Sequence, residues 1–269
     1  MSNNKKINIL IIGKKSFLGS NLSKKLILDF KVDNLTLSQV MKLNPTKCKV
    51  YSYIINTTIH KKYIKKKYDP KYDLDRKIID KFEKHKSIYI FLNSRKIYKP
   101  GFNLKENSLL RPVNYYAKNK IITEKYLIKK FNNKFLSLRI SNVIGKRLYK
   151  KNRRAHNIFL DNFLVLRNKN RKMIVEDEFK DFITIDQFIF LLKKIIRKQL
   201  IGIYNFSLGK KVYISEIIYW LDKKFYEKIK FKKSKKDSFT LSNRKLLKKL
   251  GISITKNQLK NYCTNLLSL

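Results

Sequence analysis

The chain has few cysteines and few histidines, which argues against two classes of site. Its 269 residues include two cysteines and three histidines. Cys48 and Cys263 lie too far apart in sequence to suggest a disulfide framework. The histidines, His60, His85 and His156, show no metal-ligand spacing. We therefore expect neither a disulfide-stabilised fold nor a metal centre.

Long apolar segments are also missing. The first apolar run, residues 7–12, is short, and the apolar helix expected over residues 188–196 cannot cross a bilayer. The residues ahead of the first run are polar and do not suggest a secretory signal. We therefore expect a cytoplasmic protein without a membrane span.

Acidic residues are scarce: 19 Asp and Glu stand against 64 Lys and Arg, for a formal charge of +45. Such a charge first raises the question of nucleic-acid binding. The lysines, however, occur in every segment, and we find neither an aromatic RNA-binding platform nor a helix-turn-helix pattern. We therefore expect no specific nucleic-acid partner, and interpret most lysines as solvated surface that attracts anionic ligands. The densest run, 228–236, is expected to be an exposed loop and is the best candidate for an anionic contact outside a catalytic site.

Glycine is rare as well, with seven in the chain, and two of them follow the first apolar run. Residues 7–12 are typical of a buried parallel strand, and an amphipathic stretch follows the glycines. Strand, glycine turn and helix are the context of a dinucleotide-binding loop. Gly13 would let the chain turn beside a pyrophosphate, and Gly19 would let the helix pack closely on the strand. Ser16 stands where a third glycine is common.

A tyrosine and a lysine lie one helical turn apart further along the chain. On a helix, Tyr116, Lys120 and Glu124 share one face. An ammonium fixed beside a phenol favours the phenolate, and each unit of pKa depression needs about 1.4 kcal/mol. Such a tyrosine can exchange a proton with an alcohol or an alkoxide. Because the chain has sixteen tyrosines and many lysines, this spacing also arises by chance, so its meaning depends on accompanying motifs.

A serine between these two motifs completes an ordered set. The apolar run 87–92 predicts a strand, and Ser94 would lie at its carboxyl end, where open α/β sheets bind ligands. A serine ending a strand is usually only a turn residue. Here it follows the glycine loop and precedes Tyr116 by about twenty residues, an order that gives it significance.

This ordered set resembles the extended short-chain dehydrogenase/reductases, specifically the NAD-dependent epimerase/dehydratase group that acts on nucleotide sugars. Segment 13–19 is similar to the family's Gly-x-x-Gly-x-x-Gly loop, and segment 112–124 to its Pro-x-x-x-Tyr-x-x-x-Lys-x-x-x-Glu motif. The remaining matches follow in family order over nearly the whole chain: 54–58, 92–98, 138–145, 180–186, 202–206 and 242–251.

The chain departs from the family pattern at several positions. Ser16 replaces a glycine, Asn93 replaces the serine before the catalytic one, and Lys180 replaces an arginine. Arg95 and Lys96 stand where 4,6-dehydratases carry Asp-Glu for elimination chemistry, so the resemblance disfavours that branch.

The resemblance implies an α/β fold, a Rossmann-type doubly wound parallel sheet with a smaller C-terminal substrate-binding lobe. Residues 1–145 would form the NAD(P)-binding Rossmann domain, with 183–206 returning to its sheet. Residues 146–182 and 207–269 would form the smaller lobe. The short interval between 35–37 and 54–56 predicts that the first nucleotide-binding half is reduced by a strand.

The resemblance also assigns roles to residues. The predicted catalytic residues are Ser94, Tyr116 and Lys120. The predicted cofactor-binding residues are Gly13, Ser16, Phe17, Leu18, Gly19, Asn56, Thr57, Tyr116 and Lys120. The predicted substrate-binding residues are Ser94, Asn142 and Lys180. The implied cofactor is NAD or NADP, and the implied substrate a nucleotide-diphosphate sugar.

Several alternatives stay open. Neither an acidic residue nor an obvious arginine follows segment 36–39, so the sequence does not choose between NAD and NADP. An epimerase and a 4-keto-sugar reductase would use the same residues. A rival hypothesis is a degenerate, catalytically inactive member that acts as a nucleotide- or polyanion-binding protein. The resemblance further suggests polysaccharide biosynthesis, and a homodimer is a candidate assembly.

Overall fold

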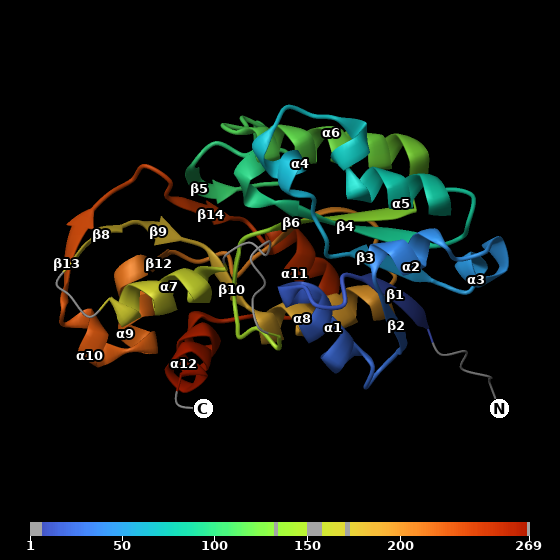
Figure 1. The fold of residues 1–269 in the computed structure, drawn as a ribbon. Coiled ribbons are helices and arrows are strands. Elements are labelled where there is room, and N and C mark those ends of the chain that lie inside the picture. The colour runs from blue at the N-terminus through green and yellow to red at the C-terminus, as the bar shows by residue number, and fades with distance from the viewer. Residues whose placement is uncertain (1–6, 132–133, 150–157, 170–172, 268–269) are drawn as a thin grey trace.

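A computed structural model of the chain describes residues 7–131, 134–149, 158–169 and 173–267. Its centre is a six-stranded sheet in which every strand runs parallel to its neighbours (Figure 1). The strands in spatial order are β11 (Gly202–Phe206), β6 (Phe135–Ile140), β4 (Ile88–Ser94), β3 (Tyr53–Asn56), β1 (Asn8–Ile12) and β2 (Lys31–Leu35).

Helices cover both faces of this sheet (Figure 1). One face carries α4 (Lys61–Lys65), α5 (Leu74–Phe82) and α6 (Tyr115–Phe131). The other carries α1 (Phe17–Leu26), α8 (Ile185–Arg197) and α11 (Arg244–Leu250). The predicted Rossmann-type, doubly wound architecture is therefore confirmed.

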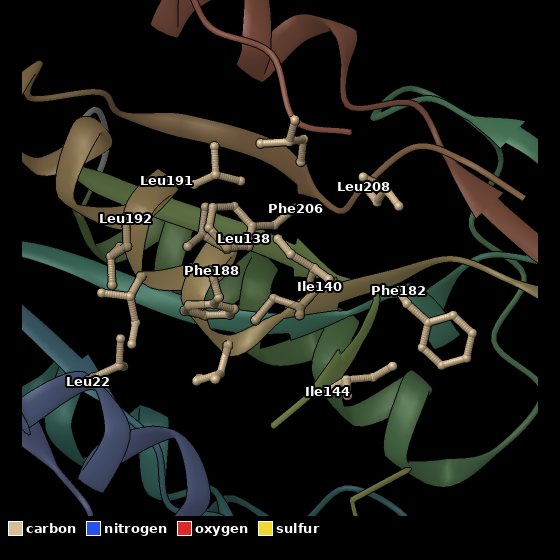
Figure 2. Close-up of a cluster of buried hydrophobic side chains, with 14 of the residues drawn as sticks. Leu22, Leu138, Ile140, Ile144, Phe182, Phe188, Leu191, Leu192, Phe206 and Leu208 are labelled. Carbon is tan, nitrogen blue, oxygen red and sulfur yellow. The ribbon is translucent and has the colours of Figure 1, made fainter. Parts of the chain in front are cut away.

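The inner strands of the sheet are largely apolar because both of their faces are buried. In β1, Ile9 and Ile11 contribute to the core under α1 and α8, whereas Leu10 and Ile12 contribute to the core under α5 and α6. Figure 2 shows the first of these cores, where side chains from α8 meet those of β6 and β11.

The first half of the sheet is short. β2 is an edge strand, and the chain leaves it through α2 (Leu37–Met41) and α3 (Pro45–Lys49) to reach β3 on the other side of β1. The whole connecting segment 36–52 is described and contains no strand. This agrees with the prediction that the first half is shortened at one of its strands.

A smaller lobe is built from short strands and helices (Figure 1). Its helices are α7 (Phe159–Asn168), α9 (Ile214–Leu221), α10 (Lys223–Tyr226) and α12 (Lys256–Leu266). Its strand pairs are β8 (Met173–Asp177) with β13 (Ile229–Lys233) and β9 (Phe179–Lys180) with β12 (Val212–Tyr213). Two further pairs join segments distant in sequence: β7 (Asn142–Ile144) with β10 (Phe182–Thr184), and β5 (Gly101–Leu104) with β14 (Phe239–Leu241). Two short 3₁₀ helices complete the elements, η1 (Pro70–Tyr72) and η2 (Arg95–Ile97).

One prediction for this lobe is wrong. The basic run 228–236 was expected to be a loop, but most of it forms β13, which pairs in parallel with β8. The reason is its alternation: Ile229 and Phe231 pack against the core, whereas Lys230, Lys232 and Lys233 are exposed. The density of lysines conceals this strand pattern in the sequence.

The length and apolar character of the helices bear on the predicted absence of a membrane span. Within residues 7–131, 134–149, 158–169 and 173–267, no helix combines the length and the apolar character needed to cross a bilayer.

The α8 core generates a stability prediction. Phe188 is fully buried and its ring meets that of Phe206 edge to face, with 4.7 Å between the ring centroids. Phe188→Ala should lower the free energy of unfolding by about 3–5 kcal/mol, because it removes buried area and leaves a cavity. Phe190 on the same helix is 43% exposed, so Phe190→Ala should cost less than about 1 kcal/mol. Urea unfolding measures both, and equal losses would contradict this packing.

Candidate active site

The turn after β1 is packed so closely that its two glycines are required. Gly13 has a φ of +117°, which residues with a side chain rarely adopt, and its N–H donates to the carbonyl of Leu35 at 2.9 Å. A Cβ on Gly13 would lie 2.4 Å from Oγ1 of Thr57. A Cβ on Gly19 would lie 2.3 Å from the carbonyl oxygen of Gly13. The loop therefore holds the start of α1 directly against the ends of β1 and β3.

Ser16, which replaces a glycine of the family motif, stabilises the same turn. Its Oγ accepts a hydrogen bond from the N–H of Gly19 at 2.9 Å and so caps α1. The same oxygen lies 2.6 Å from Oγ1 of Thr57, which donates to the carbonyl of Ile12 at 2.7 Å. The serine thus adds hydrogen bonds that a glycine could not make.

Two adjoining cavities open at the carboxyl ends of the sheet strands. One has a volume of about 500 Å³ and lies at the glycine turn. The other, about 230 Å³, is lined from the ends of β3, β4 and β6 and by α6. They share four lining residues, Leu18, Thr57, Thr58 and Ile59, and so form one groove. This groove lies where the chain switches from one side of β1 to the other, the usual ligand position in open α/β sheets.

The cavity at the glycine turn suits an anion. Gly13, Ser16, Phe17 and Leu18 line it, and Gly19 is buried against the turn. The N–H groups of Phe17 and Leu18 are the first two of α1, where backbone donors have no intrahelical partner. The helix dipole adds a positive end at the same place.

The smaller cavity brings together the three residues predicted to be catalytic. Ser94 ends β4, and Tyr116 and Lys120 lie on the first turns of α6. All three line this cavity, together with Asn56 from β3. Residues from β3, β4 and α6 thus meet in the smaller cavity, which forms one half of the groove.

Lys120 is held as a buried ammonium. Its Nζ donates to the carbonyl of Leu92 at 3.0 Å and lies 3.4 Å from Oδ2 of Asp75. It also lies 4.4 Å from the centre of the Phe91 ring. Burial alone would lower the pKa of Lys120, but Asp75, then Tyr116 and Asp73, outweigh it and raise that pKa. The side chain therefore keeps its charge beside the cavity.

Asp75 is the partner that sequence reasoning missed. Its Oδ1 accepts hydrogen bonds from Nδ2 of Asn56 at 2.9 Å and from the hydroxyl of Tyr89 at 2.8 Å. A signal was present in the sequence: the apolar positions three, four and seven residues after Asp75 place it on the buried face of α5. An acidic residue on such a face needs a buried partner, and the chain is rich in cations.

A second carboxylate lies close by. Oδ2 of Asp73 accepts hydrogen bonds from the hydroxyls of Thr123 at 2.6 Å and Tyr68 at 3.0 Å. Burial, and then the neighbouring Asp75, raise the pKa of Asp73. The buried network under α6 therefore contains two neighbouring carboxyl groups, those of Asp73 and Asp75. Their negative charge favours a cation at Lys120.

Glu124 and Arg139, both part of motifs that matched the family, form a separate buried ion pair. Nη2 of Arg139 lies 2.7 Å from Oε2 of Glu124. Asn93 donates to Oε1 of Glu124 at 2.8 Å, and its own Oδ1 accepts from the N–H of Ser94 at 2.8 Å. The substituted Asn93 therefore fixes the backbone of the predicted catalytic serine.

The two residues predicted to bind substrate from the smaller lobe do not line either cavity. Asn142 lies on β7, opposite Phe182 of β10. Nζ of Lys180 lies 2.6 Å from Glu178 and 2.9 Å from Oδ2 of Asp237. Their assignment to substrate stays a prediction.

Lys180 belongs to a cluster that joins the two lobes. Arg95, which follows the predicted catalytic serine, forms two hydrogen bonds to Asp237 at 2.6 and 2.5 Å. Burial alone would raise the pKa of Asp237, but Arg95 and Lys180 hold that pKa well below its usual range. The cluster thus fixes β14 and its approach to the end of β4.

No metal site is found in the described part of the chain, where no group of three or more His, Cys, Asp or Glu residues could hold an ion. His156 lies outside the described residues.

Comparison with known proteins gives matches in structure only. No protein-family model and no curated protein matches the chain. A UDP-N-acetylglucosamine 4-epimerase from Methanobrevibacter ruminantium is 18% identical, with a TM-score of 0.76 over 98% of each chain. The chain has the fold of nucleotide-sugar epimerases.

Two further solved structures have the same fold. WbmG from Bordetella bronchiseptica, solved with NAD, is 17% identical with a TM-score of 0.79, covering 100% of this chain and 95% of its own. A UDP-glucose 4-epimerase from Thermotoga maritima, solved with UDP-glucose, is 17% identical with a TM-score of 0.76, covering 97% and 98%. The family likeness predicted from the motifs is thus confirmed for the fold, over nearly the whole chain.

The buried pair under α6 generates a stability prediction. Asp75→Asn should lower the free energy of unfolding by about 3–5 kcal/mol, because it leaves the Lys120 ammonium buried without a counter-charge. It should also lower the pKa of Lys120. Asp80→Asn on the same helix is the matched control and should cost less than about 1 kcal/mol, since Asp80 is exposed. Urea unfolding at neutral pH measures both, and equal effects would show that Asp75 does not stabilise Lys120.

Proposed function

We propose that the chain is an NAD(P)-dependent enzyme that acts on a nucleotide-diphosphate sugar, as an epimerase or a 4-keto-sugar reductase. The observation that carries the proposal is that Ser94, Tyr116 and Lys120 line one cavity, which adjoins the cavity at the glycine turn. The NAD bound to WbmG and the UDP-glucose bound to the Thermotoga maritima enzyme support it. A cytoplasmic location, a homodimer and a role in polysaccharide biosynthesis belong to the same proposal.

The residues at the glycine turn fit a dinucleotide. Gly13 and Gly19 leave no room for a Cβ, so the backbone can approach a ligand closely. The N–H groups of Phe17 and Leu18 would donate to the pyrophosphate. Asn56 and Thr57 would lie along the ribose and nicotinamide half of the groove.

Each of the three cavity residues would have a separate role in the reaction. When bound, the nicotinamide supplies hydride transfer. Tyr116 would exchange the proton on the sugar's hydroxyl or keto oxygen, and Ser94 would donate a hydrogen bond to that oxygen. Lys120 has three N–H donors, of which two point to Leu92 and Asp75, so the third would serve the ribose.

Three departures from the family pattern favour the rival hypothesis, a nucleotide-binding protein without turnover. These are Ser16, Asn93 and the shortened first half. In the structure Ser16 caps α1 and Asn93 fixes the backbone of Ser94. Because both side chains stabilise the groove instead of blocking it, we rank catalytic activity ahead.

A substrate panel tests the proposal and separates its branches. The protein would be incubated with UDP-, GDP- and dTDP-sugars together with NAD(H) or NADP(H). A net change in the absorbance of the reduced nicotinamide would identify a reductase, and an isomerised sugar without net redox change an epimerase. Saturable cofactor binding without any product across the panel would favour the binding protein.

Substitution of the proposed proton carrier gives a sharper prediction. Tyr116→Phe should lower kcat by about 10²-fold or more, because the variant cannot exchange the proton. The dissociation constant of the dinucleotide should be nearly unchanged. Tyr115 is 48% exposed on the same turn of α6, so Tyr115→Phe is the matched control and should keep full activity. Turnover that survives in Tyr116→Phe would reject Tyr116 as the proton carrier.

A further inference from the structure

The cavity at the glycine turn is lined by three cations that do not line the smaller cavity. Lys14 and Lys15 follow Gly13, are exposed and line this cavity. Neither forms an ion pair with a described carboxylate. A third cation in the lining, Arg147, is paired with Asp161 at 2.9 Å. Among the described residues that line the cavity there is no carboxylate.

The acidic residue of β2 does not reach this cavity. Asp33 pairs in register with Leu10 in the middle of β1, two residues before Leu35, which pairs with the last residue of β1. Its Oδ2 accepts a hydrogen bond from the hydroxyl of Tyr51 at 2.7 Å. In dinucleotide-binding folds an acidic residue after this strand holds the 2′-hydroxyl of the adenosine ribose, and a cation there accommodates a 2′-phosphate.

Thr36 and Leu37 occupy the position where that acidic residue would act. Both line the cavity directly beyond the end of β2. Oγ1 of Thr36 donates a hydrogen bond to Oε1 of Gln39 at 3.0 Å and caps α2, so a neutral side chain occupies this edge of the cavity. A neutral residue here accepts a nearby phosphate, whereas a carboxylate would repel it.

We propose that this site binds NADP(H) in preference to NAD(H), with Lys14 and Lys15 binding the 2′-phosphate. This deepens the proposed function and rests on it. The 2′-phosphate adds up to two negative charges, and this cavity presents two exposed lysines that pair with no described carboxylate. The general excess of lysine could attract either dinucleotide, so the test compares these two lysines with a distant pair.

The experiment is calorimetric titration of the full chain with NAD⁺ and with NADP⁺. NADP⁺ should bind the unsubstituted protein about tenfold more tightly or better, because the 2′-phosphate gains charge-assisted hydrogen bonds. The Lys14→Gln/Lys15→Gln variant should lose most of this preference while NAD⁺ affinity changes much less. Raised ionic strength should reduce the preference as well, since the two lysines are exposed.

A charge-matched control and a variant expected to reverse the cofactor preference complete the test. Lys230→Gln/Lys232→Gln removes the same charge from exposed positions on β13 in the smaller lobe and should leave the NADP⁺ to NAD⁺ ratio unchanged. Thr36→Asp keeps an N-cap residue for α2 and places a carboxylate at the cavity, so it should lower the ratio about tenfold.

The outcomes separate this inference from the proposed function. Saturable binding in which NAD⁺ binds as tightly as NADP⁺, or tighter, overturns the preference and leaves the proposed function standing. An equal loss of the preference in the β13 control also overturns it, because the preference would then come from net charge. Binding of neither dinucleotide overturns both.

Discussion

Burial of the Lys120 ammonium is the constraint on which the groove depends. A buried cation needs a counter-charge and hydrogen-bond acceptors, and Lys120 finds them in Asp75 and the carbonyl of Leu92. Asp75 is held in turn by Asn56 and Tyr89. One set of interactions therefore fixes α5 and α6 against β3 and β4, and the predicted catalytic residues take their places from this arrangement.

Several of the scarce acidic residues form ion pairs with cations inside the molecule or between its two lobes. Glu124 pairs with Arg139 beneath α6, and Asp237 joins Arg95 to Lys180 between the two lobes. These carboxylates lie where the fold buries or crowds a cation, whereas many lysines in the described part of the chain are exposed to solvent. At these positions the carboxylate offsets the charge of a cation that the fold has removed from water.

Much of the groove could be predicted from the sequence because its motifs are local. The glycine turn follows one apolar strand, and Tyr116 and Lys120 lie on one helix face, so short-range periodicity places them. The partners of these residues could not be predicted, since Asp75 and Asp237 reach them only through tertiary packing. The strand at Ile229–Lys233 was missed for a different reason: lysines mask its alternation, and its pairing with β8 is set by the lobe's core.

The absence of a third strand in the first half has a structural consequence at the rim of the sheet. Among the described residues no strand pairs with the outer side of β2, so the backbone N–H and carbonyl groups on that side have no strand partner. A flat apolar strand in this position would invite edge-to-edge association with another molecule. Lys31 and Asp33 place exposed charges along it, and a strand added there would have to accommodate both of them. The shortened nucleotide-binding half is thus compatible with a molecule that resists aggregation through its open edge.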